Sequence, residues 1–140
     1  MYRRGTPLCI STMTTNLLGL SRKKWRATGH YVEGTESIVR LPGGLTHRKD
    51  LFGFVDLVAL SEHGSITFLQ VTSWANVSTR FRKILEKTTG KGQWEVPIRD
   101  IARRLLLAGH RIIVEGWKQK GGPGTKWIDR EREVTLEDLE

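Results

Sequence analysis

The chain has 140 residues, enough for one ordinary domain with a buried core. Lysine and arginine number 23 against 15 acidic residues, and the formal net charge of +8 favours a polyanionic partner, most commonly nucleic acid. The single cysteine excludes an internal disulfide and a multi-cysteine zinc site, so we expect a cytoplasmic protein in a reducing compartment. No apolar run approaches the ~18 residues of a membrane span, and we expect no membrane partner.

The N-terminal part is predicted to be a loose arm over residues 1–13, followed by a single domain over residues 14–140. Within this domain, leucines and a tryptophan recur at helical spacing among basic residues between positions 14 and 28. This pattern predicts an amphipathic helix over 14–28, which Gly29 would end.

Three strands are expected next. Residues 30–41 alternate in the manner of a strand, with Gly34 as a bulge or kink. A mostly apolar strand is predicted over 54–60, a hairpin turn at 62–65 and a returning strand over 66–73. The two later strands carry Val, Ile, Leu and Phe on both faces, as is typical of the middle of a covered sheet.

The remainder of the chain predicts two helices and two more strands. A basic helix is expected over 77–87 and a second helix over 98–108. Strands are expected over 110–117 and 126–136, separated by a glycine-rich basic loop over 118–125. This order predicts an α/β fold with a single central mixed β-sheet flanked by helices.

Two polar residues stand out in the apolar strands. Asp56 lies in the sequence FVDLVAL, and Gln70 lies across the hairpin in FLQVTS. A carboxylate in an apolar sheet is costly without compensation. It either pairs with a backbone amide or an arginine, or binds a metal with Gln70 as a cross-strand neighbour.

The strand–turn–strand sequence FVDLVAL…ITFLQVTS resembles the core of the PD-(D/E)XK nuclease superfamily, including Holliday-junction resolvases and VRR-type nucleases. The resemblance covers about residues 14–117 and implies an αβββαβ, restriction-endonuclease-like core. In that family an aspartate lies on the second strand, and an acid-x-lysine tripeptide lies on the third.

The resemblance implies roles for individual residues. Asp56 matches the metal-binding aspartate, Gln70 falls at the second acidic position, and Val71 would offer its backbone carbonyl to the metal. Thr72 falls where the catalytic lysine belongs. The implied cofactor is Mg²⁺ or Mn²⁺, which would polarise the scissile phosphate and lower the pKa of an attacking water.

Because Gln70 and Thr72 replace the acid and the lysine of the tripeptide, an active site would need a carboxylate and a cation from other residues. Lys49, or Lys83 on the following helix, is a candidate for the missing cation. The missing carboxylate has three candidates, of which Glu36 is favoured; the three are Glu33, Glu36 and Asp50.

Basic residues form a candidate binding surface for the phosphate backbone of a nucleic acid. They lie before the second strand, on the helix after the third and around the glycine-rich loop. The candidate nucleic-acid-binding residues are Arg48, Arg80, Arg82, Lys83, Lys118 and Lys120.

Three functions remain open on the sequence. The first is a metal-dependent DNA endonuclease, acting on branched DNA and homodimeric by analogy with the resolvases. The second is a catalytically inactive DNA-binding protein of the same fold, since both the acid and the lysine of the tripeptide are replaced. The third is a basic RNA-binding or assembly protein without a metal site.

Overall fold

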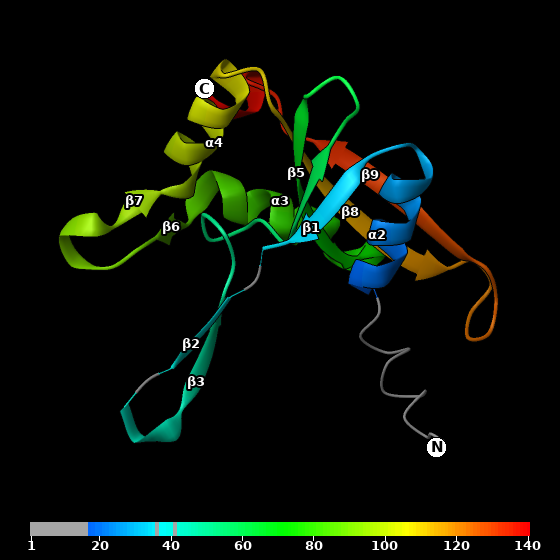
Figure 1. Ribbon diagram of the computed structural model, residues 1–140, viewed down its shortest axis with the longest axis horizontal. Coiled ribbons are helices and arrows are strands. Elements are labelled where there is room, and N and C mark those ends of the chain that lie inside the picture. The colour runs from blue at the N-terminus through cyan, green and yellow to red at the C-terminus, as the bar shows by residue number, and fades with distance from the viewer. Residues whose placement is uncertain (1–16, 36, 41) are drawn as a thin grey trace.

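The computed structural model describes residues 17–35, 37–40 and 42–140, with the backbone alone for 37–40 and 46–48. It shows an α/β fold in which helices flank one mixed five-stranded sheet (Figure 1). None of the helices in the described part of the chain is long and apolar enough to cross a membrane. The five strands, in spatial order, are β1 (Tyr31–Gly34), β4 (Leu57–Leu60), β5 (Ile66–Ser73), β8 (Arg111–Gln119) and β9 (Trp127–Glu133).

The element order confirms the predicted αβββαβ arrangement. Strands β1, β4 and β5 form an antiparallel meander, and β8 runs parallel to β5. The parallel step needs a long crossover, which here contains the helices α3 (Val77–Glu86) and α4 (Ile98–Leu107). Strand β9 then returns antiparallel to β8 and forms one edge of the sheet.

Helix α2 (Leu17–Ala27) covers one face of the sheet, as the helical spacing predicts. Trp25 is buried there with Val32, Leu57 and Leu69 of the sheet. The helix ends at the expected glycine: Gly29 has φ 88°, a left-handed conformation that glycine adopts without strain. Helices α3 and α4 cover the opposite face with a larger apolar cluster, which includes Phe68, Phe81, Ile84, Ile98 and Ile112.

The strand predicted over 30–41 is wrong as a single element. It ends at Gly34, which lies beside the end of the Arg22 side chain of α2, 2.7 Å from the position of an added Cβ. The chain then leaves the sheet, and β2 (Ser37–Arg40) pairs with β3 (Thr46–Lys49) as a separate ribbon that projects from the body (Figure 1).

Two further boundaries differ from expectation. Strand β4 begins at Leu57 rather than at residue 54, because residues 51–55 form a turn in which Phe52 has φ 56°. The predicted helix break near residue 90 contains a second ribbon, β6 (Thr88–Thr89) paired with β7 (Val96–Pro97). Four short 3₁₀ helices complete the described structure: η1 (Pro42–Gly44), η2 (Trp74–Asn76), η3 (Gly92–Trp94) and η4 (Glu137–Leu139).

Candidate metal and nucleic-acid site

Asp56 and Gln70 lie close together at one end of the β4–β5 hairpin. Leu57, the first residue of β4, pairs with Leu69, and Asp56 immediately precedes this ladder. The Asp56 N–H donates to the carbonyl of Leu69 over 2.8 Å, and the Val71 N–H donates to Asp56 Oδ2 over 2.8 Å. Gln70 lies on the α3–α4 side of β5, because Phe68, two residues earlier on the same face, packs in the α3–α4 cluster.

The Asp56 carboxyl is a weaker acid than an ordinary aspartate. Its pKa is raised from 3.8 to about 6, mainly by burial and to a smaller extent by the nearby charge of Asp50. The hydrogen bond from Val71 and the positive charges of Arg80 and Lys83 lower it. Of the sequence alternatives for Asp56, the structure contains the partner within the protein: the carboxylate accepts a backbone amide and lies within the electrostatic reach of two cations.

Gln70 is buried to 1% exposure, and its Oε1 has no hydrogen-bond partner among the described residues. A buried polar atom without a partner costs about 1–3 kcal/mol, which is unusual in a folded protein. An amide oxygen is a good ligand for a hard cation, and so is a carboxylate. The residue types at positions 56 and 70 therefore fit Mg²⁺ or Mn²⁺.

Thr72 lies two residues beyond Gln70 on the same face of β5 and is buried at 5% exposure. A threonine hydroxyl carries no charge, so the cation that the resemblance requires must come from elsewhere. Arg80 and Lys83 approach Asp56 from α3, as their effect on its pKa shows.

Helix α3 presents a basic groove beside Asp56. The groove has a volume of about 440 Å³, and its lining includes four cationic side chains and one acid, Glu86. The four cations are Arg80, Arg82, Lys83 and Lys87. Three of the predicted phosphate-binding residues are therefore brought together on one helix.

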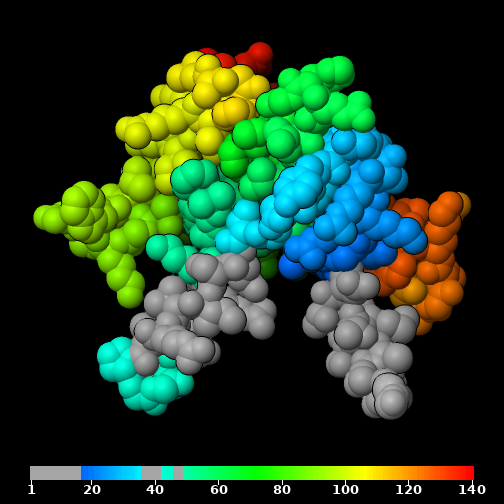
Figure 2. All heavy atoms as spheres, viewed as in Figure 1, coloured from blue at the N-terminus to red at the C-terminus, as the bar shows by residue number. Residues whose placement is uncertain are grey.

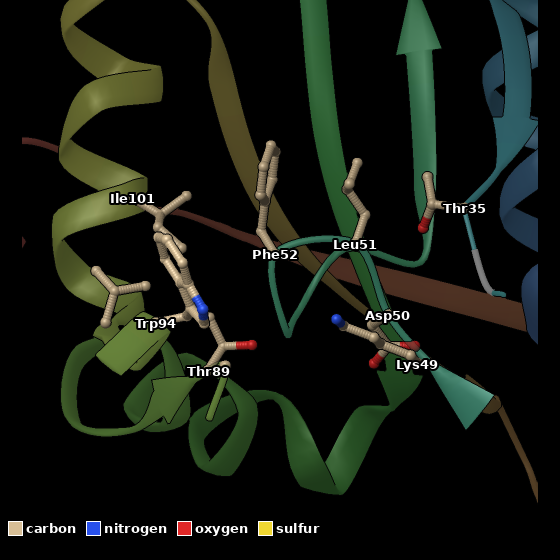
Figure 3. Close-up of a pocket in the computed structure, with 10 residues that line it drawn as sticks. Thr35, Lys49, Asp50, Leu51, Phe52, Thr89, Trp94 and Ile101 are labelled. Carbon is tan, nitrogen blue, oxygen red and sulfur yellow. The ribbon is translucent and has the colours of Figure 1, made fainter. Parts of the chain in front are cut away.

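A second cleft, of about 480 Å³, opens between residues 49–52 and the β6–β7 ribbon (Figure 3). Lys49 and Asp50 form one side of it, and the Lys49 ammonium points into the opening. Two of the predicted residues cannot be placed here. Glu36 lies outside the described residues, and so does the side chain of Arg48.

Lys118 and Lys120 lie at the far end of β8, away from this cleft. The Lys118 ammonium lies 4.2 Å from the ring centre of Trp74, and the Arg130 guanidinium lies 5.0 Å from it. Arg130 also donates to the Trp74 carbonyl over 2.7 Å. Because Trp74 immediately precedes α3, these cations extend the positive surface from the start of α3 towards the glycine-rich loop.

The sequence reasoning missed an acidic cluster on the α2 face. Glu115, Asp129 and Glu131 place carboxylate oxygens within 4.8 Å of one another, an arrangement that could hold a metal ion. The Lys24 ammonium donates to all three carboxylates. Burial alone lowers the pKa of Lys24, but these hydrogen bonds outweigh it and hold the pKa above its ordinary value.

The cluster therefore carries its own cation. Glu115 is fully buried and also accepts hydrogen bonds from Ser21 Oγ at 2.5 Å and Trp25 Nε1 at 3.3 Å. Two features of the sequence could have indicated this cluster. One is a glutamate inside the apolar sequence IIVEGW, and the other is the alternation of acidic residues along β9. All three carboxylates of this cluster are paired with Lys24. Gln70 Oε1, by contrast, is a buried oxygen that has no described partner and could bind a metal ion.

No protein-family model matches the chain, and comparisons with curated proteins and with solved structures give no match. The function is therefore argued from the site alone.

Proposed function

We propose that this protein is a metal-dependent DNA endonuclease that hydrolyses phosphodiester bonds. The observation that carries the proposal is that the Asp56 carboxylate binds the Val71 N–H, next in the chain to Gln70, whose buried Oε1 has no described partner. An aspartate and a buried, unused amide oxygen in this neighbourhood supply two oxygen ligands of the kind that Mg²⁺ or Mn²⁺ binds.

In the proposed site, three groups of residues have separate roles: they bind the metal ion, bind the DNA backbone and supply the cation. Asp56 and Gln70 would hold the ion, with the Val71 carbonyl as a third oxygen ligand. The bound ion would polarise the scissile phosphate and lower the pKa of the attacking water. Helix α3 would bind the DNA backbone through the cations that line its groove, and Lys49 or Lys83 would stand in for the absent lysine.

A second candidate function is favoured by Thr72. The family tripeptide has a lysine at this position, and Thr72 is buried and uncharged. A protein with the same basic groove but no competent catalytic cation would bind DNA without cutting it. Salt-sensitive affinity and no cleavage are expected in that case.

The deciding experiment measures binding and cleavage separately. Linear duplex and four-way-junction DNA are incubated with the protein and Mg²⁺, Mn²⁺ or EDTA, and binding is followed by fluorescence anisotropy in EDTA. We expect metal-dependent cleavage with a preference for the junction, lost in Asp56→Asn while DNA binding and the circular dichroism spectrum are retained.

Two variants and one control test whether Gln70 binds the metal ion. Gln70→Glu restores a carboxylate at the tripeptide position and is expected to tighten Mn²⁺ binding, measured by isothermal titration calorimetry, whereas Gln70→Leu weakens it. Arg111→Gln, at the first residue of β8 and in an ion pair with Glu133, leaves both metal binding and cleavage unchanged. DNA binding without cleavage in either metal would favour the second candidate, and the expected homodimer is checked by light scattering.

A further inference from the structure

The β6–β7 ribbon is a rigidly built arm. Its two strands pair through Thr88 with Pro97 and Thr89 with Val96, and it stands out from the body at one side of the molecule (Figure 2). The connecting turn is closed by hydrogen bonds from Trp94 N–H to the Lys91 carbonyl over 3.0 Å and from Glu95 N–H to the Gly92 carbonyl over 3.1 Å. The conformation of the arm is therefore set by its own backbone.

Gly90 makes this turn possible. Its φ is 88°, and a Cβ at this position would overlap the carbonyl oxygen of Trp94. The backbone of one side of the arm therefore lies directly against the residue that carries the indole. A side chain at position 90 would push Trp94 out of its present place.

Trp94 is 77% exposed, although the backbone that carries it is well fixed. An indole is a large apolar surface that usually packs inside a protein or against a partner. Here it forms one wall of the 480 Å³ cleft and lies across the opening from Lys49 and Asp50 (Figure 3). The floor between these walls includes Leu51 and Phe52.

The chemistry of the cleft fits a flat, partly polar ligand. Apolar and aromatic side chains line it, while Lys49 and Asp50 offer a hydrogen-bond donor and an acceptor at one edge. Phe52 holds a left-handed backbone conformation at φ 56°, which is unfavourable for a bulky side chain and is typical of ligand sites. A nucleobase has this combination of a broad π-face and a polar edge.

The cleft also lies beside the site proposed for phosphodiester hydrolysis. Asp50, which lines the cleft, is close enough to Asp56 to raise its pKa, and Arg80 and Lys83 act on the same carboxyl from α3. Strand β6 begins two residues after α3 ends, so the basic groove and the arm are consecutive in the chain. The cleft and the basic groove on α3 therefore lie on consecutive parts of the chain, where one DNA strand would contact both.

From these relationships, and resting on the proposed function, we propose that the cleft receives one unpaired DNA base, stacked on the indole of Trp94. The flanking phosphates lie on α3. The protein thus recognises DNA that offers an unstacked base, such as a bulge or a branch point, in preference to a perfect duplex.

The test compares a duplex carrying one bulged nucleotide with the matched perfect duplex, in EDTA so that no cleavage occurs. The bulged base is 2-aminopurine, whose fluorescence reports its stacking, and affinity is measured by anisotropy of an end label. We expect the wild type to prefer the bulged duplex and to change the 2-aminopurine signal. Trp94→Ala lowers affinity for the bulged duplex by about tenfold, the scale of one lost base–aromatic stack, and leaves affinity for the perfect duplex unchanged.

Two further variants serve as controls. Trp94→Phe keeps a ring and retains most of the preference. Tyr31→Ala removes another exposed aromatic residue, 63% exposed on the edge strand β1, and leaves the preference intact. Thermal unfolding of each variant shows that the fold is kept.

The two proposals fail in different ways. Equal preference for the bulge in Trp94→Ala and the wild type overturns the base site, whether or not the protein cuts DNA. A preference that depends on Trp94 together with no cleavage in Mg²⁺ or Mn²⁺ supports the base site and contradicts the endonuclease. No binding of the wild type to any of these DNAs overturns both.

Discussion

The Val71 N–H donates a hydrogen bond to Asp56 Oδ2 over 2.8 Å, and burial nevertheless raises the pKa of this carboxyl to about 6. One amide bond thus compensates only part of the cost of removing the charge from water. At neutral pH the carboxylate is ionised but held in an unfavourable environment. A bound divalent cation would relieve this cost, and so would removal of the charge.

Asp56→Asn is therefore expected to stabilise the metal-free protein at neutral and higher pH. The folded pKa of about 6 exceeds the ordinary 3.8, so the ionised carboxylate destabilises the fold above pH 6, and this penalty disappears as the pH falls through 6 towards 3.8. We expect a gain in unfolding free energy on the order of 1–3 kcal/mol at about pH 8 and little change at about pH 4. Urea unfolding of both proteins at the two pH values measures it. A variant less stable than the wild type at the higher pH would contradict the assigned environment of Asp56.

The groove on α3 is expected to set the salt dependence of DNA binding. Removing both charges with Arg80→Gln and Lys83→Gln lowers the number of neutralised phosphates, so the slope of log affinity against log salt becomes less steep by about 0.9 for each lost contact. Anisotropy titrations across a salt series measure the slope. Arg111→Gln, whose guanidinium is paired with Glu133 over 2.9 Å, is the matched charge control and should keep the wild-type slope. An unchanged slope in the double variant would show that DNA does not lie on α3.

Lys24 is expected to be essential for stability because it neutralises the buried Glu115. Lys24→Met leaves a fully buried carboxylate without its cation and should cost about 3–5 kcal/mol. The double variant Lys24→Met with Glu115→Met removes both charges and should recover much of this loss. Denaturant unfolding of the two singles and the double forms a double-mutant cycle. Additive losses would mean that the two residues are not coupled.

Gly116 holds β8 close to the start of α3. A Cβ at this position would overlap Val77 Cγ2 and would lie 3.0 Å from the Ser73 carbonyl oxygen and from Trp74 Cα. Gly116→Ala should destabilise the protein by roughly 1–3 kcal/mol and displace the start of α3. Tryptophan fluorescence should also change, because Trp74 lies at the contact. Unaltered unfolding and fluorescence would contradict the close approach.

Much of the fold could be predicted from local patterns. Strand β5 spans residues 66–73 as predicted, and α3 and α4 each end one residue before their predicted limits. These elements combine a clear hydrophobic period with a glycine or turn at their ends, so local and tertiary preferences agree. Gly109, which directly follows the predicted helix over 98–108, has φ 93°, a left-handed conformation typical of the glycine that closes a helix.

The errors arose where a contact distant in sequence decides the outcome. The alternation over 30–41 is the same before and after Gly34, so it does not show that the later residues pair with β3 instead of continuing in the sheet. The β6–β7 arm has strands of two residues each, too short to show a period.

At the candidate site, the hairpin sequence brings Asp56 close to the strand that carries Gln70, where its carboxylate accepts the Val71 N–H. The cleft beside them could not be predicted, because Trp94 and Asp50 are separated by more than forty residues in the sequence. Their roles in metal and DNA binding remain predictions.

Helix α2 and strand β9 are joined through Lys24, although 105 residues separate it from Asp129 and 107 from Glu131. On a ribosome, α2 emerges about a hundred residues before the carboxylates that bind Lys24. Until β8 and β9 have been synthesised, the Lys24 ammonium lacks these carboxylates, and the apolar side of α2 has only the β1–β4–β5 meander to cover. Closure of that face is thus a late event in biosynthesis, and contacts of such long sequence separation favour slow folding.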